Sequence, residues 1–118
     1  MQAPERERLG RAGINVSDAL ERFMGNDALL ERFLKKFLSD SNYEKLTAAI
    51  DAGDRETALT AAHTLKGVCG NLGMSELFDL LTKQVAAFRA DRWEDAANLM
   101  PDISLAYERV VEELKNLR

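Results

Sequence analysis

The chain has 118 residues, of which 46% are hydrophobic and 31% are charged, and its formal net charge is -4. This length and composition are typical of one compact globular domain. The excess of acidic residues argues against a nucleic-acid or anionic-membrane partner, because both require a basic surface. A single cysteine excludes an intramolecular disulfide, and no apolar run approaches the roughly 20 residues that span a bilayer. We therefore expect a cytoplasmic protein.

Apolar residues recur every three or four positions without period-2 alternation, which predicts an all-α fold. Residues 1–13 are polar and contain one proline and two glycines, so we expect a flexible lead-in there. The domain proper is then expected over residues 14–118. Its first element is a short helix that starts at Ser17 or Asp18 and ends at Gly25.

The next helix is predicted to start at Asn26 or Asp27, which are good capping residues. Ser41 and Glu44 match a capping box for the helix that follows, and Gly53 is expected to end it. The first of these two helices carries apolar residues at helical spacing, which predicts that they face the core: Leu30, Phe33, Leu34, Phe37 and Leu38.

Asp54 is predicted to cap a long helix that runs to about Leu72 and stops at Gly73. A further helix is expected over residues 75–90, with an apolar stripe of Leu77, Leu81, Val85 and Phe88. Asp91 and Glu94 match another capping box before the C-terminal segment, in which Pro101 either kinks one helix or begins a second. The apolar stripe of that segment stays in phase across the proline and consists of Leu99, Ile103, Ala106, Val110, Leu114 and Leu117.

Short connections between these helices predict an antiparallel four-helix bundle with an additional short N-terminal helix. We expect a monomer, because the apolar stripes of such a bundle can cover one another.

The only histidine, His63, lies on the helix predicted over residues 54–72. On a helical wheel, one side of this helix is apolar and forms the core stripe of Ala58, Ala62, Leu65, Cys69 and Leu72. Cys69 is therefore interpreted as a packing residue and not as a reactive thiol. The opposite side carries His63, Lys66, Gly67 and Gly70, so the imidazole is predicted to be exposed.

Imidazole can act as a neutral nucleophile near pH 7, so phosphorylation of His63 on nitrogen is chemically possible. Lys66, one turn further on, places a positive charge where a phosphoryl group would lie. Glycine costs about 1 kcal/mol relative to alanine inside a helix, so Gly67 needs a reason to be there. Together with Gly70 and the apolar Leu59 one turn before the histidine, it predicts a docking surface around the imidazole.

Gln84 interrupts the apolar stripe of the helix predicted over residues 75–90. In a hairpin that turns near Gly73, Gln84 and His63 lie at a similar height. One interpretation is that the glutamine hydrogen-bonds the ring nitrogen that does not carry the phosphoryl group. The alternative is a boundary residue whose amide reaches water.

The stretch "AAHTLKGVCGNLG", residues 61–73, resembles the signature of histidine-containing phosphotransfer (HPt) domains. The upstream stretch "INVSDALERFMGNDALLERFLKKF", residues 14–37, is also similar to the lead-in of these domains. This resemblance implies that His63 is the phospho-acceptor and that Lys66 interacts with the phosphoryl group. It also implies that Gly67 is left bare so that a response-regulator receiver domain can dock.

The chain has no nucleotide-binding loop, so it is not expected to phosphorylate itself. By the resemblance, the partner is a receiver domain or a hybrid histidine kinase, and a receiver supplies the aspartate and a bound Mg²⁺. No cofactor or metal of the chain's own is expected. One alternative is a helical interaction module in which His63 is never phosphorylated. A di-iron bundle is disfavoured, because Thr60 stands where a Glu-x-x-His motif would need glutamate.

Overall fold

The computed structural model describes residues 1–117, and this part of the chain is almost entirely helical. No helix in it is both long and apolar enough to cross a membrane. The elements of residues 1–117 are α1 (Ala3–Arg11), α2 (Val16–Arg22), α3 (Asp27–Lys36), the 3-10 helix η1 (Phe37–Ser39), α4 (Asn42–Ala52), α5 (Arg55–Asn71), α6 (Ser75–Arg89), α7 (Trp93–Asn98) and α8 (Met100–Lys115).

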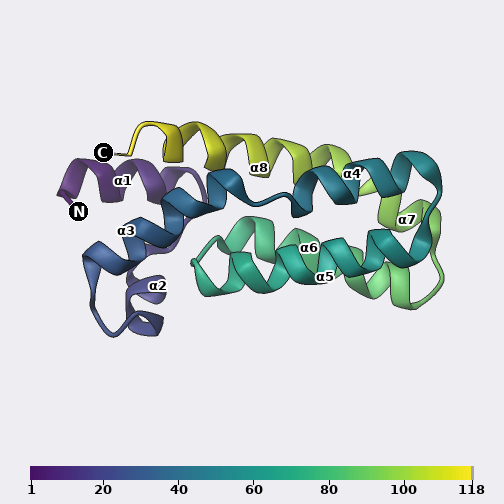
Figure 1. Ribbon diagram of the computed structural model, residues 1–118, viewed down its shortest axis with the longest axis horizontal. Helices are drawn as coiled ribbons and strands as arrows, with labels where there is room; N and C mark the ends of the chain where they lie inside the picture. Colours follow the sequence, from purple (N-terminus) through teal and green to yellow (C-terminus); the bar gives the residue numbers. More distant parts are fainter. Residues whose placement is uncertain (118) are drawn as a thin grey trace.

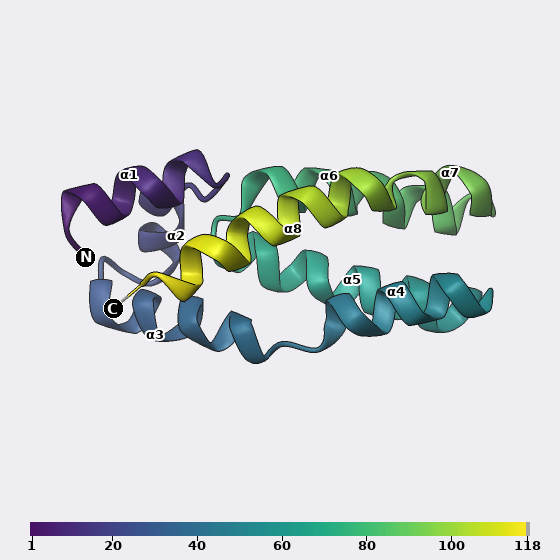
Figure 2. The same cartoon turned by 90° about the horizontal axis from the view of Figure 1, so that it is seen from above.

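The longer helices run along the molecule, which measures 43 × 23 × 20 Å (Figures 1 and 2). Helix α4 packs against α5, α5 packs against α6, and α6 packs against α8, with successive helices running in opposite directions. Helix α8 also contacts α3 and η1, whereas α1 and α2 lie at the N-terminal end. This arrangement confirms the predicted all-α antiparallel bundle.

The N-terminal segment differs from the prediction of a flexible lead-in. Residues 3–11 form α1, which packs on α8, and the side chain of Leu9 is only 1% exposed. Just after α1, the backbone N–H of Asn15 donates to the carbonyl of Gly73 at 2.7 Å. The folded part of the chain therefore starts before residue 14. The local sequence pattern could not predict this, because α1 packs on α8, which is about 100 residues away in the sequence.

Most predicted helix boundaries are confirmed, although some caps differ. Asn26 caps α3 by accepting a hydrogen bond from the N–H of Leu29 at 3.0 Å. Helix α2 is capped by Asn15, and not by Ser17 or Asp18, since the Asn15 side chain accepts from the N–H of Asp18 at 3.0 Å. The Ser41 side chain makes no capping bond, and instead Asp40 accepts from the N–H of Asn42.

The segment after α6 shows a third difference in capping. The predicted capping box of Asp91 and Glu94 does not form: α7 begins at Trp93 without a side-chain cap, and Asp91 has a φ of +58°. Asp91 instead pairs with Arg55 of α5. Pro101 lies in the first turn of α8. Of the two predicted alternatives, a kink within one helix or the start of a second helix, the second is therefore confirmed.

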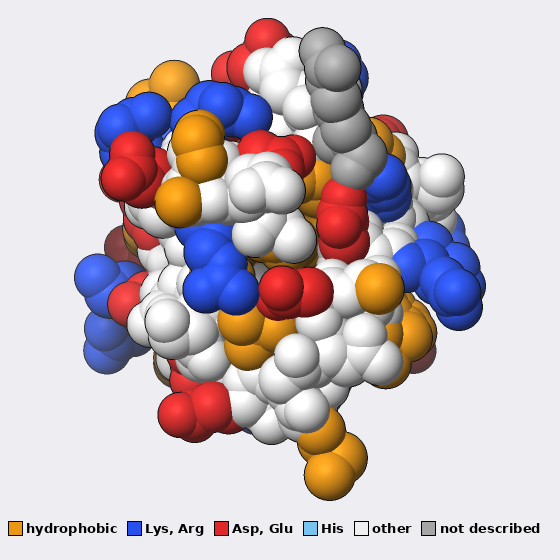
Figure 3. Space-filling view, turned by 90° about the vertical axis from the view of Figure 1, so that its left-hand side faces the viewer, with side chains coloured by type: hydrophobic (Ala, Val, Ile, Leu, Met, Phe, Trp, Pro, Cys, Tyr) orange, Lys and Arg blue, Asp and Glu red, His pale blue; other side chains and the backbone are white. Residues whose placement is uncertain are grey.

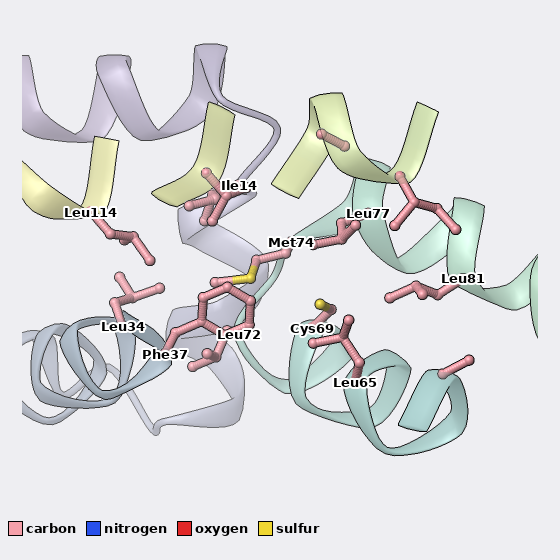
Figure 4. Packing of buried hydrophobic residues seen from close by; sticks show 14 of the residues in the cluster. Ile14, Leu34, Phe37, Leu65, Cys69, Leu72, Met74, Leu77, Leu81 and Leu114 are labelled. Carbon is pink, nitrogen blue, oxygen red and sulfur yellow. The ribbon is translucent and has the colours of Figure 1, made fainter. Parts of the chain in front are cut away.

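The core is formed by apolar side chains from every long helix. Figure 4 shows Leu65 and Cys69 of α5 facing Leu77 and Leu81 of α6. Phe33 and Leu38 were expected in the core, but they are 41% and 39% exposed. Figure 3 shows the end of the molecule at which α1, α2 and α3 lie, and acidic, basic and hydrophobic side chains are interspersed there.

Candidate functional site

Helix α5 carries the candidate site, and a side-chain cap defines where this helix begins. The Oδ1 atom of Asp54 accepts a hydrogen bond from the backbone N–H of Thr57 at 3.1 Å. The side-chain and backbone hydrogen bonds with Thr57 lower the pKa of the Asp54 carboxyl below its ordinary value. The ionised carboxylate also interacts favourably with the positive end of the helix dipole. The site therefore stands on a well-capped helix of 17 residues.

The two sides of α5 are those that the helical wheel predicts. His63 and Gly67 are exposed, whereas Lys66 and Gly70 are half-buried beside α6. The structure thus brings the predicted residues together on one side of α5 and leaves the imidazole open to a partner. The opposite side faces the core, with less than 5% exposure for each of Ala58, Ala62, Leu65, Cys69 and Leu72.

The Lys66 side chain reaches across to α6. Its Nζ atom lies 5.9 Å from the centroid of the Phe78 ring, which is within the range of a cation–π interaction. Lys66 takes part in none of the ion pairs among residues 1–117. Because an aromatic ring attracts a cation without neutralising it, the ammonium keeps its full charge near the histidine side of the helix.

Two glycines follow His63 on α5, and the space around their Cα atoms differs. A Cβ atom added to Gly67 would have no neighbour within 4 Å, so packing inside the protein does not require glycine there. A Cβ atom added to Gly70 would lie 3.0 Å from the Phe78 ring, so packing within the protein explains that glycine. Of these two glycines, Gly67 is therefore the one that the packing of the described residues does not explain.

Gln84 does not hydrogen-bond His63, and the prediction that it does is wrong. Its side chain is fully buried, and its Nε2 donates to the carbonyl of Ala96 at 3.0 Å and to Sδ of Met100 at 3.2 Å. Ala96 lies near the end of α7, and its carbonyl also accepts from the backbone N–H of Leu99 at 3.2 Å. Gln84 thus links α6 to the α7–α8 junction as a second donor to the Ala96 carbonyl, whereas the exposed His63 faces away from the core.

Leu59 is half-buried, one helical turn before His63, and it lines a surface pocket of about 330 Å³. The sequence did not predict this pocket, because its walls come from three helices. The sequence predicted Leu59 at a docking surface, Phe88 in the core and Asp91 in a capping box, and it predicted no role for Trp93. The lining residues are Arg55, Glu56, Leu59, Phe88, Asp91 and Trp93.

We predict that iodoacetamide does not alkylate Cys69 in the folded protein. The side chain is fully buried, and burial, with a smaller contribution from the charge of Asp40, raises the pKa of its thiol well above the ordinary range. Since only the thiolate reacts, mass spectrometry should find the thiol unmodified in native buffer and modified in denaturing urea. Rapid alkylation of the folded protein would contradict the interpretation of Cys69 as a packing residue.

One comparison with known protein families gives a match. The model of the Hpt domain family matches residues 28–117, which contain all of α3 except its first residue, η1, the helices α4 to α8 and the whole candidate site. No curated protein and no solved structure gives a match. Because the family model covers well over half of the chain, the chain belongs to the family of Hpt domains, the phosphocarriers of histidine phosphotransfer in two-component signalling.

Proposed function

We propose that His63 is the residue that carries the phosphoryl group, and that it exchanges this group with the aspartate of receiver domains. Hpt domains serve phosphorelays as carriers without kinase activity of their own. The observation that carries the assignment is an exposed imidazole followed, one turn later, by a glycine that the protein's own packing does not require.

The proposed transfer requires that the imidazole of His63 and the aspartyl phosphate of the receiver domain are held next to each other. A neutral imidazole nitrogen of His63 attacks the phosphorus of an aspartyl phosphate on the receiver domain, so that a P–N bond forms as the P–O bond breaks. The receiver's aspartate leaves as a carboxylate, and the reverse reaction returns the phosphoryl group. A Mg²⁺ ion on the receiver domain would stabilise charge on the transferring oxygens.

Lys66 is proposed to stabilise the phosphoryl group on His63. The two residues are three positions apart on one helix, which is the spacing of side chains that face each other. The cation–π interaction with Phe78 leaves the ammonium unneutralised, so it can form a charge-assisted hydrogen bond with a phosphoryl oxygen. Leu59 and Gly67 are proposed to contact the docked receiver domain on either side of the imidazole.

The proposal is tested by phosphoryl transfer from a panel of receiver domains charged with acetyl phosphate and Mg²⁺. We expect at least one receiver to pass label to the chain, with the acid-labile and alkali-stable behaviour of phosphohistidine. If no receiver in a broad panel transfers label, the carrier assignment to His63 is wrong. The remaining interpretation is then an interaction module that docks without phosphorylation.

We predict that Gly67→Leu stabilises the folded protein but weakens binding of the receiver domain. A leucine at this helical and unobstructed position should raise the free energy of unfolding by about 0.5–1 kcal/mol, because it restricts the unfolded chain more than glycine does. The same side chain should obstruct the receiver domain and lower its affinity by at least about ten-fold.

The matched control for this prediction is Gly10→Leu. Gly10 is also exposed, helical and without neighbours within 4 Å, but it lies on α1 at the N-terminal end (Figure 1). Urea unfolding should show a similar gain for both variants, and receiver titrations should show a loss for Gly67→Leu alone. Unchanged receiver affinity in Gly67→Leu would show that the partner does not approach this turn.

A further inference from the structure

The pocket beside Leu59 is formed where the start of α5, the end of α6 and the start of α7 meet. Its apolar walls are Leu59, Phe88 and Trp93, and all three side chains are half-buried. Arg55 and Asp91 lie at its rim and are exposed. At about 330 Å³ it has room for a single protruding side chain of a partner.

The walls of the pocket are held by contacts between the helices. The Arg55 guanidinium forms a hydrogen-bonded ion pair with Asp91 and also lies 5.9 Å from the centroid of the Trp93 ring. The rings of Phe88 and Trp93 pack at a centroid distance of 5.7 Å and are tilted by 49°. Since these contacts exist within the chain alone, the pocket is formed before a partner arrives, which lowers the entropic cost of binding.

The pocket lies within the area that a domain docked on His63 must cover. Leu59 precedes His63 by four residues and Arg55 by eight, which correspond to about 6 Å and 12 Å along the helix axis. A standard interface covers about 800 Å² on each partner, equivalent to a disc of about 16 Å radius. Leu59 also lies within about 40° of His63 around the helix, so a receiver domain centred on the imidazole extends toward the mouth of the pocket.

We propose that this pocket receives an apolar side chain of the receiver domain, and that Phe88 and Trp93 are specificity-determining residues. This inference rests on the proposed function, because it takes the receiver domain as the partner. Tryptophan in a preformed apolar pocket is typical of residues that dominate binding energy at interfaces. The exposed Arg55–Asp91 pair at the rim would reject partners whose charges do not match, and would contribute little to folding stability.

Trp93 is the only tryptophan in the chain, so its fluorescence reports on the pocket directly. The wild-type protein is titrated with a receiver domain that lacks tryptophan, in its beryllofluoride-activated form with Mg²⁺. The receiver is chosen from the panel as the one that transfers label fastest. We expect a blue shift of the Trp93 emission and a loss of its quenching by acrylamide when the receiver binds, because the ring leaves water.

A variant tests whether the pocket contributes to affinity. Trp93→Ala should weaken receiver binding by about ten-fold or more, measured by calorimetry. Its phosphorylation by phosphoramidate should stay at the wild-type rate, because this small donor transfers its phosphoryl group to the imidazole and leaves as ammonia without occupying the pocket. The control is Leu105→Ala on α8, an apolar side chain that is 61% exposed and not part of the pocket, and its receiver affinity should not change.

The outcomes separate this inference from the carrier function. If His63 receives label while Trp93 emission, acrylamide quenching and the affinity of Trp93→Ala stay unchanged, the pocket is not a docking site and the carrier function stands. If neither the receiver panel nor phosphoramidate labels His63 and no receiver binds, both proposals are wrong. The fluorescence titration uses the wild-type protein, so it remains decisive even if Trp93→Ala unfolds.

Discussion

Replacement of His63 by glutamine is expected to abolish phosphorylation of the chain completely. Glutamine keeps a polar side chain of similar length at this exposed position but offers no nucleophilic nitrogen, so no P–N bond can form. The measurement is transfer of radiolabelled phosphoryl group from a charged receiver domain, with acid and alkali treatment to identify the linkage.

The His63→Gln variant should fold like the wild type, because His63 faces away from the core. Its melting temperature and its affinity for the activated receiver are therefore the matched controls. Acid-labile label that persists in a folded His63→Gln protein would contradict the assignment of this residue, since it is the only histidine in the chain. Loss of receiver binding together with loss of label would indicate that the imidazole also contributes to docking.

Gly73→Ala is expected to cause the largest loss of stability of any substitution considered, about 3 kcal/mol or more. Gly73 ends α5 with a φ of +69°, and this conformation alone costs an alanine about 1–2 kcal/mol. An added Cβ atom would also lie 2.4 Å from the carbonyl oxygen of Asn15, so the backbone must shift. That shift would strain the 2.7 Å hydrogen bond from the Asn15 N–H to the Gly73 carbonyl.

Gly25→Ala provides the matched control for Gly73→Ala. Gly25 has a φ of +76°, but an added Cβ atom there has no neighbour within 4 Å. Only the conformational cost of about 1–2 kcal/mol should remain. Urea unfolding followed by circular dichroism measures both losses, and equal losses would show that the contact with Asn15 adds nothing to the effect of the positive φ.

Local patterns predicted the part of the site that lies on one helix. The exposure of His63, the burial of Cys69 and the bare position of Gly67 all follow from a repeat of 3.6 residues per turn. The breaks between helices were predicted for a similar reason, because glycine alone adopts a positive φ without strain. Each of these features depends on residues within a few turns of one another.

The sequence could not predict contacts between segments that are distant along the chain. One interpretation paired Gln84 with His63 because both lie at a similar height in the α5–α6 hairpin, yet the Gln84 amide reaches the α7–α8 junction. Height along a helix does not specify the direction of a side chain around it. Phe33 likewise keeps helical spacing with the core residues of α3, but no helix covers it fully.

The sequence by itself determined the all-α class, most helix boundaries, and the side of α5 on which His63 and Lys66 lie, since periodicity and backbone preference are local properties. The tertiary structure alone decided that Leu9 packs into the core and that Leu59 and Trp93 share a pocket. These outcomes depend on how helices rotate and pack against one another. Helix packing depends on the burial of side chains from many segments at once, so it cannot be predicted from any single stretch of sequence.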